Sequence, residues 1–342
     1  MAVTMAEIAE RVGVAKVTVS LALRNSRKVA TDTRKRIRAL AKEMGYRKNP
    51  GHSVIANRRW RGNRRAESLL VAILFESREA EGYQCKIRAE EIRAIKARGT
   101  TFGYEFDIFY FSDYPSAKRL EEVMFHRGVC GIIVGLFKKD ARIKEMTFQH
   151  FPGVSLSAGY FIPSIPVVRN HISQSVSISF EACLQKGYER PGFLIPHLSL
   201  SELHRASMGM ALLSLRSEGL PSGLLYEKQL EPDMVRNWYQ EWRPDVVIGL
   251  NSGLKDFLTS ISLRIPHDLG YVTMKKHKND TLFAGVKATI EEVGEATLNQ
   301  LDLLIRQNHF GLMANPPQLL VTPTWSDGES LPEKHSERND VS

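Results

Sequence analysis

The stretch from Thr4 to Asn25, TMAEIAERVGVAKVTVSLALRN, has the spacing of two short helices joined by a tight turn. Ala9 is small enough for a second helix to cross closely, and Gly13 can adopt the positive φ that a sharp turn demands. Val19 can fill the angle between the two helices. Such a unit can lay its second helix, about Lys16 to Leu23, in the major groove of DNA. The alternative is an ordinary helical hairpin in a bundle.

Basic residues are concentrated in the same part of the chain. Residues 1–65 hold 17 lysines and arginines against 4 acidic residues, whereas the rest of the chain holds 30 against 34. A basic head on a slightly acidic body indicates a surface built for a polyanion. A solvated basic tail is the alternative, but the helical periodicity of this segment argues against it.

Two further signals complete a helical headpiece over residues 1–50. The capping box Thr4-Met5-Ala6-Glu7 predicts the start of the first helix. Thr31 is the predicted cap of a third helix, Gly45 is its predicted C′ residue, and one face is apolar at helical spacing: Ile37, Leu40, Ala41 and Met44. Residues 51–65 read as a basic linker that could become a short helix on meeting DNA.

After residue 66, apolar runs alternate with amphipathic segments. Strands are predicted at 69–75, 104–111, 128–136, 153–157, 167–170, 192–196, 224–230, 245–251, 269–274 and 283–287. Helices are predicted near 85–98, 116–126, 173–186, 201–218, 232–242, 253–263 and 289–308. This alternation implies parallel sheets covered on both faces, here arranged as two doubly wound lobes. Such folds bind small ligands at the carboxyl ends of their strands.

Several classes of protein are disfavoured. A signal sequence and a long uncharged apolar run are both missing, so we expect a cytoplasmic protein without a membrane partner. The three cysteines lie far apart without CxxC spacing, which argues against a disulfide framework or a zinc site. No P-loop, GxGxxG, GxSxG or HExxH motif is present, so we expect no enzyme, no catalytic residue, no cofactor and no metal.

The order of these parts resembles the LacI/GalR (lactose-repressor) family of bacterial transcription regulators. The resemblance covers about residues 4 to 331 and is carried by the headpiece, GYRKNP, FEACLQKGYERPGFL, RASMGMALLSLRSEGL, PDVVIGLNSGL and IPHDLGYV. It implies an all-α helix-turn-helix headpiece and an α/β body of two doubly wound parallel sheets, like that of periplasmic binding proteins. The implied domains are a headpiece (1–50), a hinge helix (51–65), an N-terminal lobe (66–187 and 286–318), a C-terminal lobe (188–285 and 319–331) and a disordered tail (332–342).

The resemblance places base readout at the start of the second helix. Lys16 could donate to guanine O6 and N7, and Val17 could touch a thymine methyl group. Leu21 stands where the family often has arginine, so one common guanine contact is missing. Other matched positions mostly hold phosphates and set the register: Thr4, Thr18, Ser20, Asn25, Thr33 and Tyr46. The alternative for Thr18 and Ser20 is a hydroxyl that merely faces solvent.

The basic face of the third helix and the linker add to the expected DNA contacts. Arg34 is expected to strengthen binding to all DNA. Ile55, nine residues after Tyr46, falls at the position of the family's aliphatic wedge in the minor groove. His52 lies where the family usually has a smaller residue that packs hinge on hinge. The alternative is that Ile55 is a linker residue without a partner.

The resemblance also implies an effector held between the two lobes. Arg205 matches an arginine that often grips the ligand, and Asn251 and Asn170 match polar positions at strand ends. Lys275 and Lys276 replace an expected aspartate, which favours an altered, anionic ligand or none at all. Glu76 is a further candidate, and the alternative for Arg205 is a salt bridge.

These features together predict a DNA-binding transcriptional regulator, a repressor of the LacI type. It would bind a pseudo-palindromic operator as a homodimer and respond to a small-molecule effector, a sugar or derivative. A dimer is the default because residues 332–342 lack apolar heptad periodicity. The alternative function is that of a cytoplasmic solute-binding protein, for a sugar or sugar phosphate, without operator-specific DNA binding.

Overall fold

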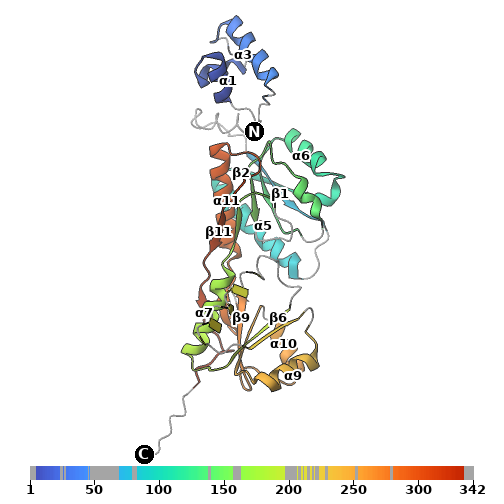
Figure 1. Cartoon of the computed structure of the whole chain (residues 1–342), viewed down its shortest axis with the longest axis vertical. Coiled ribbons are helices and arrows are strands. Elements are labelled where there is room, and N and C mark those ends of the chain that lie inside the picture. Colours follow the sequence, from blue (N-terminus) through green and yellow to red (C-terminus); the bar gives the residue numbers. More distant parts are fainter. Residues whose placement is uncertain are drawn as a thin grey trace, which may run out of the picture.

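The computed structural model describes residues 5–23, 26, 28–44, 46, 69–78, 83–137, 140–156, 163–196, 206, 209–210, 212–213, 216–217, 219, 223–227, 230–250, 253–277 and 280–334. Three parts follow one another along the longest axis of the molecule: a helical headpiece, a first lobe and a second lobe (Figure 1). Each lobe contains its own six-stranded sheet. The predicted combination of a helical headpiece with a two-lobed α/β body is therefore confirmed.

The headpiece is a bundle of three helices: α1 (Met5–Val12), α2 (Lys16–Leu23) and α3 (Thr31–Glu43). Gly13 has a φ of 76°, and its N–H donates to the carbonyl of Ala9 over 2.9 Å, so the predicted left-handed turn is confirmed. Val19 is completely buried between the helices, as its position predicted. It shares a small core with Ile8 and Ile37.

The start of α3 differs from the prediction. Ala30 is the N-cap residue and makes no side-chain hydrogen bond to the helix, whereas Thr31 already occupies the first helical position. A hydroxyl at that position cannot reach the free N–H groups of the next turn, and the Thr31 hydroxyl instead accepts from Arg34 over 3.4 Å. The predicted cap Thr4 and the predicted C′ residue Gly45 lie outside the described residues.

The first lobe contains a parallel sheet in the order β11-β5-β4-β3-β1-β2. Its strands are β1 (Leu69–Phe75), β2 (Tyr104–Tyr110), β3 (Val129–Val134), β4 (Gly153–Leu156), β5 (Val167–Asn170) and β11 (Gln318–Val321). Its helices are α5 (Tyr83–Phe102), η1 (Phe111–Asp113), α6 (Ala117–His126), η2 (Ala141–Glu145) and α11 (Ile290–Gln307).

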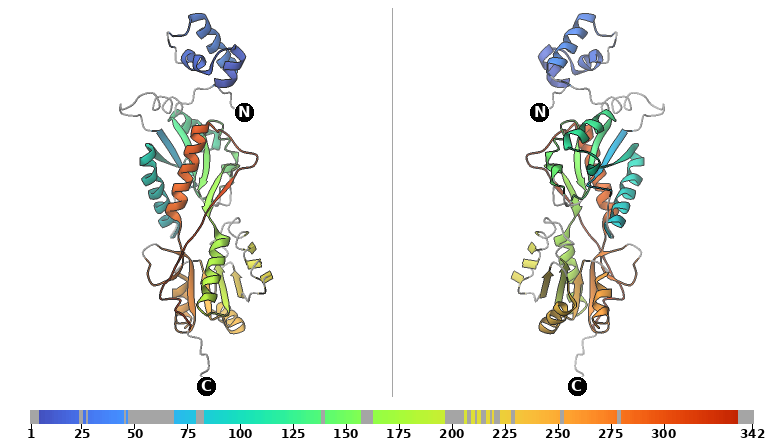
Figure 2. Two further views of the ribbon diagram at one scale, coloured as in Figure 1. Left: turned by 90° about the vertical axis from the view of Figure 1, so that its left-hand side faces the viewer. Right: turned by 90° about the vertical axis from the view of Figure 1, so that its right-hand side faces the viewer.

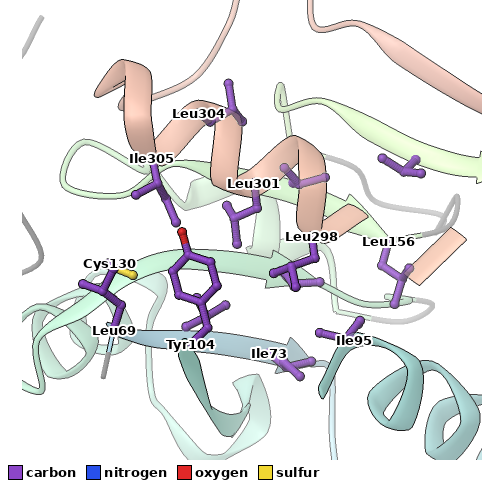
Figure 3. Packing of buried hydrophobic residues seen from close by; sticks show 14 of the residues in the cluster. Leu69, Ile73, Ile95, Tyr104, Cys130, Leu156, Leu298, Leu301, Leu304 and Ile305 are labelled. Atoms are coloured by element: carbon purple, nitrogen blue, oxygen red, sulfur yellow. The ribbon is translucent and has the colours of Figure 1, made fainter. Parts of the chain in front are cut away.

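Side-chain alternation along β1 shows how this sheet is covered on both faces. Leu69, Val71 and Ile73 pack with residues of α5 and α11, whereas Ala72 and Leu74 pack with α6 and η2. Figure 3 shows the first of these two cores, in which leucines of α11 lie above the strands. A continuous apolar strand between two helical layers is what a buried parallel sheet requires.

The second lobe contains a sheet in the order β12-β10-β9-β8-β6-β7, parallel except for β12. Its strands are β6 (Pro191–Pro196), β7 (Gly223–Glu227), β8 (Val246–Gly249), β9 (Gly270–Lys276), β10 (Ala284–Lys287) and β12 (Trp325–Ser326). One face is covered by α7 (Ile172–Gln185), and the other is covered by α9 (Pro232–Trp242) and α10 (Gly253–Ser260).

The packing shifts three of the expected domain boundaries. Helix α7 lies in the range assigned to the first lobe, but its Val176 and Phe180 pack with β8 and β9 of the second lobe. Residues 319–321, assigned to the second lobe, belong to β11 and pair with β5 of the first. The expected tail begins later than residue 332. The Tyr188 hydroxyl donates to the carbonyl of Pro332, and the N–H of Lys334 donates to the carbonyl of Lys186. Residues 335–342 lie outside the described residues.

The chain crosses between the lobes three times, at 170–172, 287–290 and 321–325 (Figure 2). The first crossing leaves the carboxyl end of β5, and the second leaves the carboxyl end of β10. Since the strands of each sheet are parallel, except β12, the carboxyl ends of both sheets meet at the boundary between the lobes. This boundary, where Asn170 and Lys287 end their strands, is the edge that α/β folds use for ligands.

Two smaller sequence predictions concern the cysteines and the membrane. Cys130 and Cys183 are free and buried, as predicted for small core residues, and burial raises the pKa of the Cys130 thiol to about 12. Within the described ranges, none of the helices has the length and apolar character needed to span a membrane.

Candidate DNA-binding face and lobe boundary

The first turn of α2 projects from the headpiece core. Lys16 is exposed, and Val17 exposes 68% of its surface, the largest fraction of any large apolar residue described in the chain. Thr18 and Ser20 are half-buried beside them. A cation, a methyl-bearing side chain and two hydroxyls therefore share one short helix whose opposite side is held by the buried Val19. This set can donate to base edges, contact a thymine methyl group and bind phosphates.

Leu21 and Tyr46 lie differently from Lys16 and Val17. Both are half-buried and pack against the three-helix core, so their apolar atoms contribute to headpiece stability. Burial raises the pKa of the Tyr46 hydroxyl. The structure therefore separates these two residues from the projecting pair that was predicted to read bases.

The arginines of α3 keep the charge of the headpiece while holding its parts together. Arg34 is half-buried and donates to the carbonyl of Ser26 over 3.2 Å, which fixes the segment between α2 and α3. Arg36 donates to the carbonyl of Val12 over 3.3 Å and ties α3 to the end of α1. Both acceptors are neutral carbonyls, so these two contacts add no negative charge to the headpiece. The role of Arg36 was missed, since nothing in the sequence distinguishes it from its basic neighbours.

Lys35 and Lys42 are the simplest candidates for long-range attraction of phosphate on α3. Both side chains are exposed, and neither makes a hydrogen bond or ion pair with another described residue. Thr33 is half-buried nearby on the same helix. Thr4, Asn25, His52 and Ile55, which were also predicted to contact DNA, lie outside the described residues.

At the lobe boundary, three carboxylates of the first lobe are engaged by their own neighbours. Glu76, which follows β1, accepts a hydrogen bond from the backbone N–H of Asp140. Asp140 in turn pairs with Arg142 over 2.5 Å, and this guanidinium holds the pKa of the Asp140 carboxyl below its usual value. Asp113 pairs with Arg78 over 2.7 Å. The predicted ligand role of Glu76 is therefore in competition with a structural role.

Of the four remaining effector candidates, the structure describes two. Asn170 is half-buried at the end of β5 and pairs in register with Val321 of β11. Lys275 is half-buried near the end of β9, and its backbone N–H donates to the Thr273 hydroxyl over 3.3 Å. Arg205 and Asn251 lie outside the described residues.

Lys275 faces a residue that sequence reasoning missed. Burial lowers the pKa of its ammonium group, and the carboxylate of Glu91 on α5 of the other lobe opposes this shift. The two residues are separated by 184 positions, so no local pattern could have linked them. The described residues contain no cluster of histidine, cysteine or acidic side chains that could hold a metal ion.

Comparisons with known proteins agree with this arrangement of a headpiece and two lobes. Residues 4–49 match the profile of the bacterial regulatory proteins of the lacI family. No curated protein matches the chain. Among solved structures, the Lac repressor dimer bound to operator and the anti-inducer ONPF has 16% identity and a TM-score of 0.57, covering 97% of this chain and 100% of that one.

Two further solved structures have the same fold over most of their length. A LacI-family transcriptional regulator from Silicibacter pomeroyi has 18% identity and a TM-score of 0.53, covering 96% of this chain and 99% of that one. The transcriptional regulator CelR in complex with cellobiose has 16% identity and a TM-score of 0.53, with the same coverage. At these identities the structures establish the fold of the body, and the headpiece match is the more specific finding.

Proposed function

We propose that this chain, whose residues 4–49 match the lacI family of bacterial regulatory proteins, represses transcription by binding a pseudo-palindromic operator as a homodimer in the cytoplasm. The observation that carries the proposal is the exposed first turn of α2, where Lys16 and the 68%-exposed Val17 project from a buried core. A large apolar side chain exposed beside a cation on a basic domain can contact base edges in the major groove.

The proposed roles of individual residues follow from their exposure. Lys16 donates to guanine, and Val17 contacts a thymine methyl group. Thr18, Ser20, Thr33 and Arg34 hold phosphates and fix the register of α2 on the duplex. Leu21 and Tyr46 support this surface from the core side. For Thr4, Asn25, His52 and Ile55, we propose the DNA contacts that the family resemblance implies.

The body is proposed to pair two copies of the chain and to bind a small-molecule effector between the lobes. Support comes from the shared fold of the Lac repressor dimer bound to operator and of CelR in complex with cellobiose. Asn170, Arg205, Asn251 and Lys275, with Glu76 at the edge, are the proposed effector contacts. The three chain crossings act as the hinge about which the lobes move. No catalytic step, cofactor or metal is part of this proposal.

Operator selection tests the proposal directly. The full-length chain is incubated with a pool of randomised duplexes, and bound DNA is amplified and sequenced over several rounds. We expect enrichment of an inverted repeat, because a symmetric dimer presents two copies of α2. A pool that stays random after selection would contradict sequence-specific binding, and binding of a sugar without any DNA selection would favour a solute-binding protein.

A further inference from the structure

Two adjacent lysines near the end of β9 have opposite surroundings. The Lys276 ammonium is buried and donates to the Ser326 hydroxyl over 3.0 Å and to the Asp327 carbonyl over 2.7 Å. Its role is structural, since it joins β9 to β12 and the residue after it. Because side chains alternate along a strand, Lys275 lies on the other face of β9. Among the described residues, its Nζ has no hydrogen bond and no ion pair, and the backbone N–H of Lys275 donates to the Thr273 hydroxyl.

A half-buried ammonium without such a partner is unfavourable, because water is removed and nothing replaces it. Burial accordingly lowers the pKa of Lys275. The carboxylate of Glu91, on α5 across the lobe boundary, attracts it electrostatically. Lys275 therefore retains the capacity to bind an anion directly.

The facing edge of the first lobe does not supply that anion. Three carboxylates there are engaged by groups of their own lobe: Glu76 by the Asp140 backbone, Asp140 by Arg142 and Asp113 by Arg78. Hydroxyl-rich neutral ligands are commonly held by carboxylates that accept their hydrogen bonds. An edge at which these three carboxylates are occupied, opposite an ammonium without a hydrogen bond, suits an anionic ligand better than a neutral one.

We propose that the effector is a small anionic metabolite, bearing a phosphate or carboxylate group, which binds the Lys275 ammonium at the lobe boundary in competition with Glu91. This inference rests on the effector-binding function proposed above. The anion forms a charge-assisted hydrogen bond with Lys275, while the Glu91 carboxylate repels it. Because the two residues come from different lobes, anion binding also alters the electrostatic attraction between the lobes.

Inorganic phosphate is the probe that tests this assignment, with the melting temperature of the body in the full-length chain as the readout. Sodium chloride at matched ionic strength controls for screening. We expect phosphate to raise the melting temperature of wild type, and Lys275→Met to weaken the apparent affinity at least about tenfold. Glu91→Gln should tighten it about two- to fivefold, because a repelling charge is removed.

Lys287→Met is the matched control, because Lys287 is an exposed lysine at the carboxyl end of the neighbouring strand β10. It should bind phosphate as wild type does. The inference is overturned if phosphate has no effect on wild type, or if Lys275→Met responds as strongly as wild type. Binding of neutral glucose that is indifferent to Lys275→Met would overturn the anionic class alone. Operator selection in the same preparation is independent of these outcomes, so the failure of this inference is distinguishable from the failure of the proposed function.

Discussion

The headpiece and the body treat their charged residues in opposite ways. Several arginines of the body pair with acids, as in Arg78–Asp113 and Arg127–Asp107, both at 2.7 Å. In the headpiece, Arg34 and Arg36 donate to main-chain carbonyls, and Lys16 and Lys35 are exposed. The body thus neutralises its own charge, whereas the headpiece retains a positive field. This difference indicates that the surface of the headpiece suits a polyanionic partner.

The two regions also differ in how much core supports them. The described core of the headpiece has only eight buried apolar residues, whereas each lobe has two separate apolar clusters. Small cores tolerate few losses, because net stability is a small difference between large opposing contributions. Substitutions should therefore separate the two regions clearly.

The largest expected effect is on the headpiece core. Ile37→Ala removes a completely buried side chain and should cost about 2–5 kcal/mol, enough to unfold so small a unit. DNA binding should be lost while the body melts at its wild-type temperature, as calorimetry of the full-length chain can show. Leu303→Ala, at a 45%-exposed position of α11, is the control. If Ile37→Ala lowered the melting temperatures of the headpiece and the body equally, the two would not be separate folding units.

The next effect separates base readout from phosphate attraction within the headpiece. Lys16→Ala should cost about 1–3 kcal/mol against the selected operator, with little change against random duplex. Lys35→Ala should weaken both kinds of DNA about equally and reduce the salt dependence by about one counterion. Fluorescence anisotropy at several salt concentrations measures both. If the two variants behave alike, the assignment of base readout to α2 and of phosphate attraction to α3 is wrong.

A smaller effect on stability is expected in the body, where Lys334 helps to keep the Asp245 carboxyl ionised. Burial disfavours the Asp245 carboxylate, but hydrogen bonds from Lys334 and the backbone N–H groups of Glu189 and Arg190 outweigh it, so its pKa is lowered. Its stabilising contribution is therefore present above the ordinary pKa of aspartate and is lost as the pH falls through the folded-state pKa. Asp245→Asn should destabilise the second lobe by about 1 kcal/mol at pH 7.

The pH profile provides the control for that prediction. Once the pH falls below the lowered pKa of Asp245, the wild-type carboxyl becomes protonated, so the melting temperatures of wild type and Asp245→Asn should converge. DNA affinity at pH 7 should be the same for both proteins, because Asp245 lies in the lobe farthest from the headpiece (Figure 1). A constant difference in melting temperature at every pH would show that the charge of Asp245 is irrelevant to stability.

Much of the fold could be predicted from the sequence because its signals are local. The positive φ of Gly13 and the burial of Val19 follow from helix spacing, and the strand at 69–75 follows from a continuous apolar run. Packing between distant segments could not be predicted. Nothing in the sequence of α7 indicates which lobe it packs against. Strand β11 has only four residues, which are mostly exposed, so it lacks the apolar run of a buried strand.

In the candidate site, too, local features could be predicted from the sequence and contacts between distant segments could not. The exposure of Lys16 and Val17 follows from the helical period once Val19 is assigned to the core. The attraction between Lys275 and Glu91, and the engagement of Glu76 by Asp140, depend on how separate strands and lobes meet. Sequence reasoning therefore identified the candidate residues of the body but not the partners that decide what they can bind.

Site-directed cross-linking tests the central claim, that the first turn of α2 contacts DNA bases, most directly. Val17→Cys is labelled with a benzophenone maleimide, mixed with the selected operator and irradiated. Leu312→Cys, a 46%-exposed position in the body, and the unsubstituted chain are treated in the same way as controls. The account predicts a covalent adduct with operator DNA from position 17 and none above background from position 312. Equal cross-linking from both positions, or none from position 17, would contradict it.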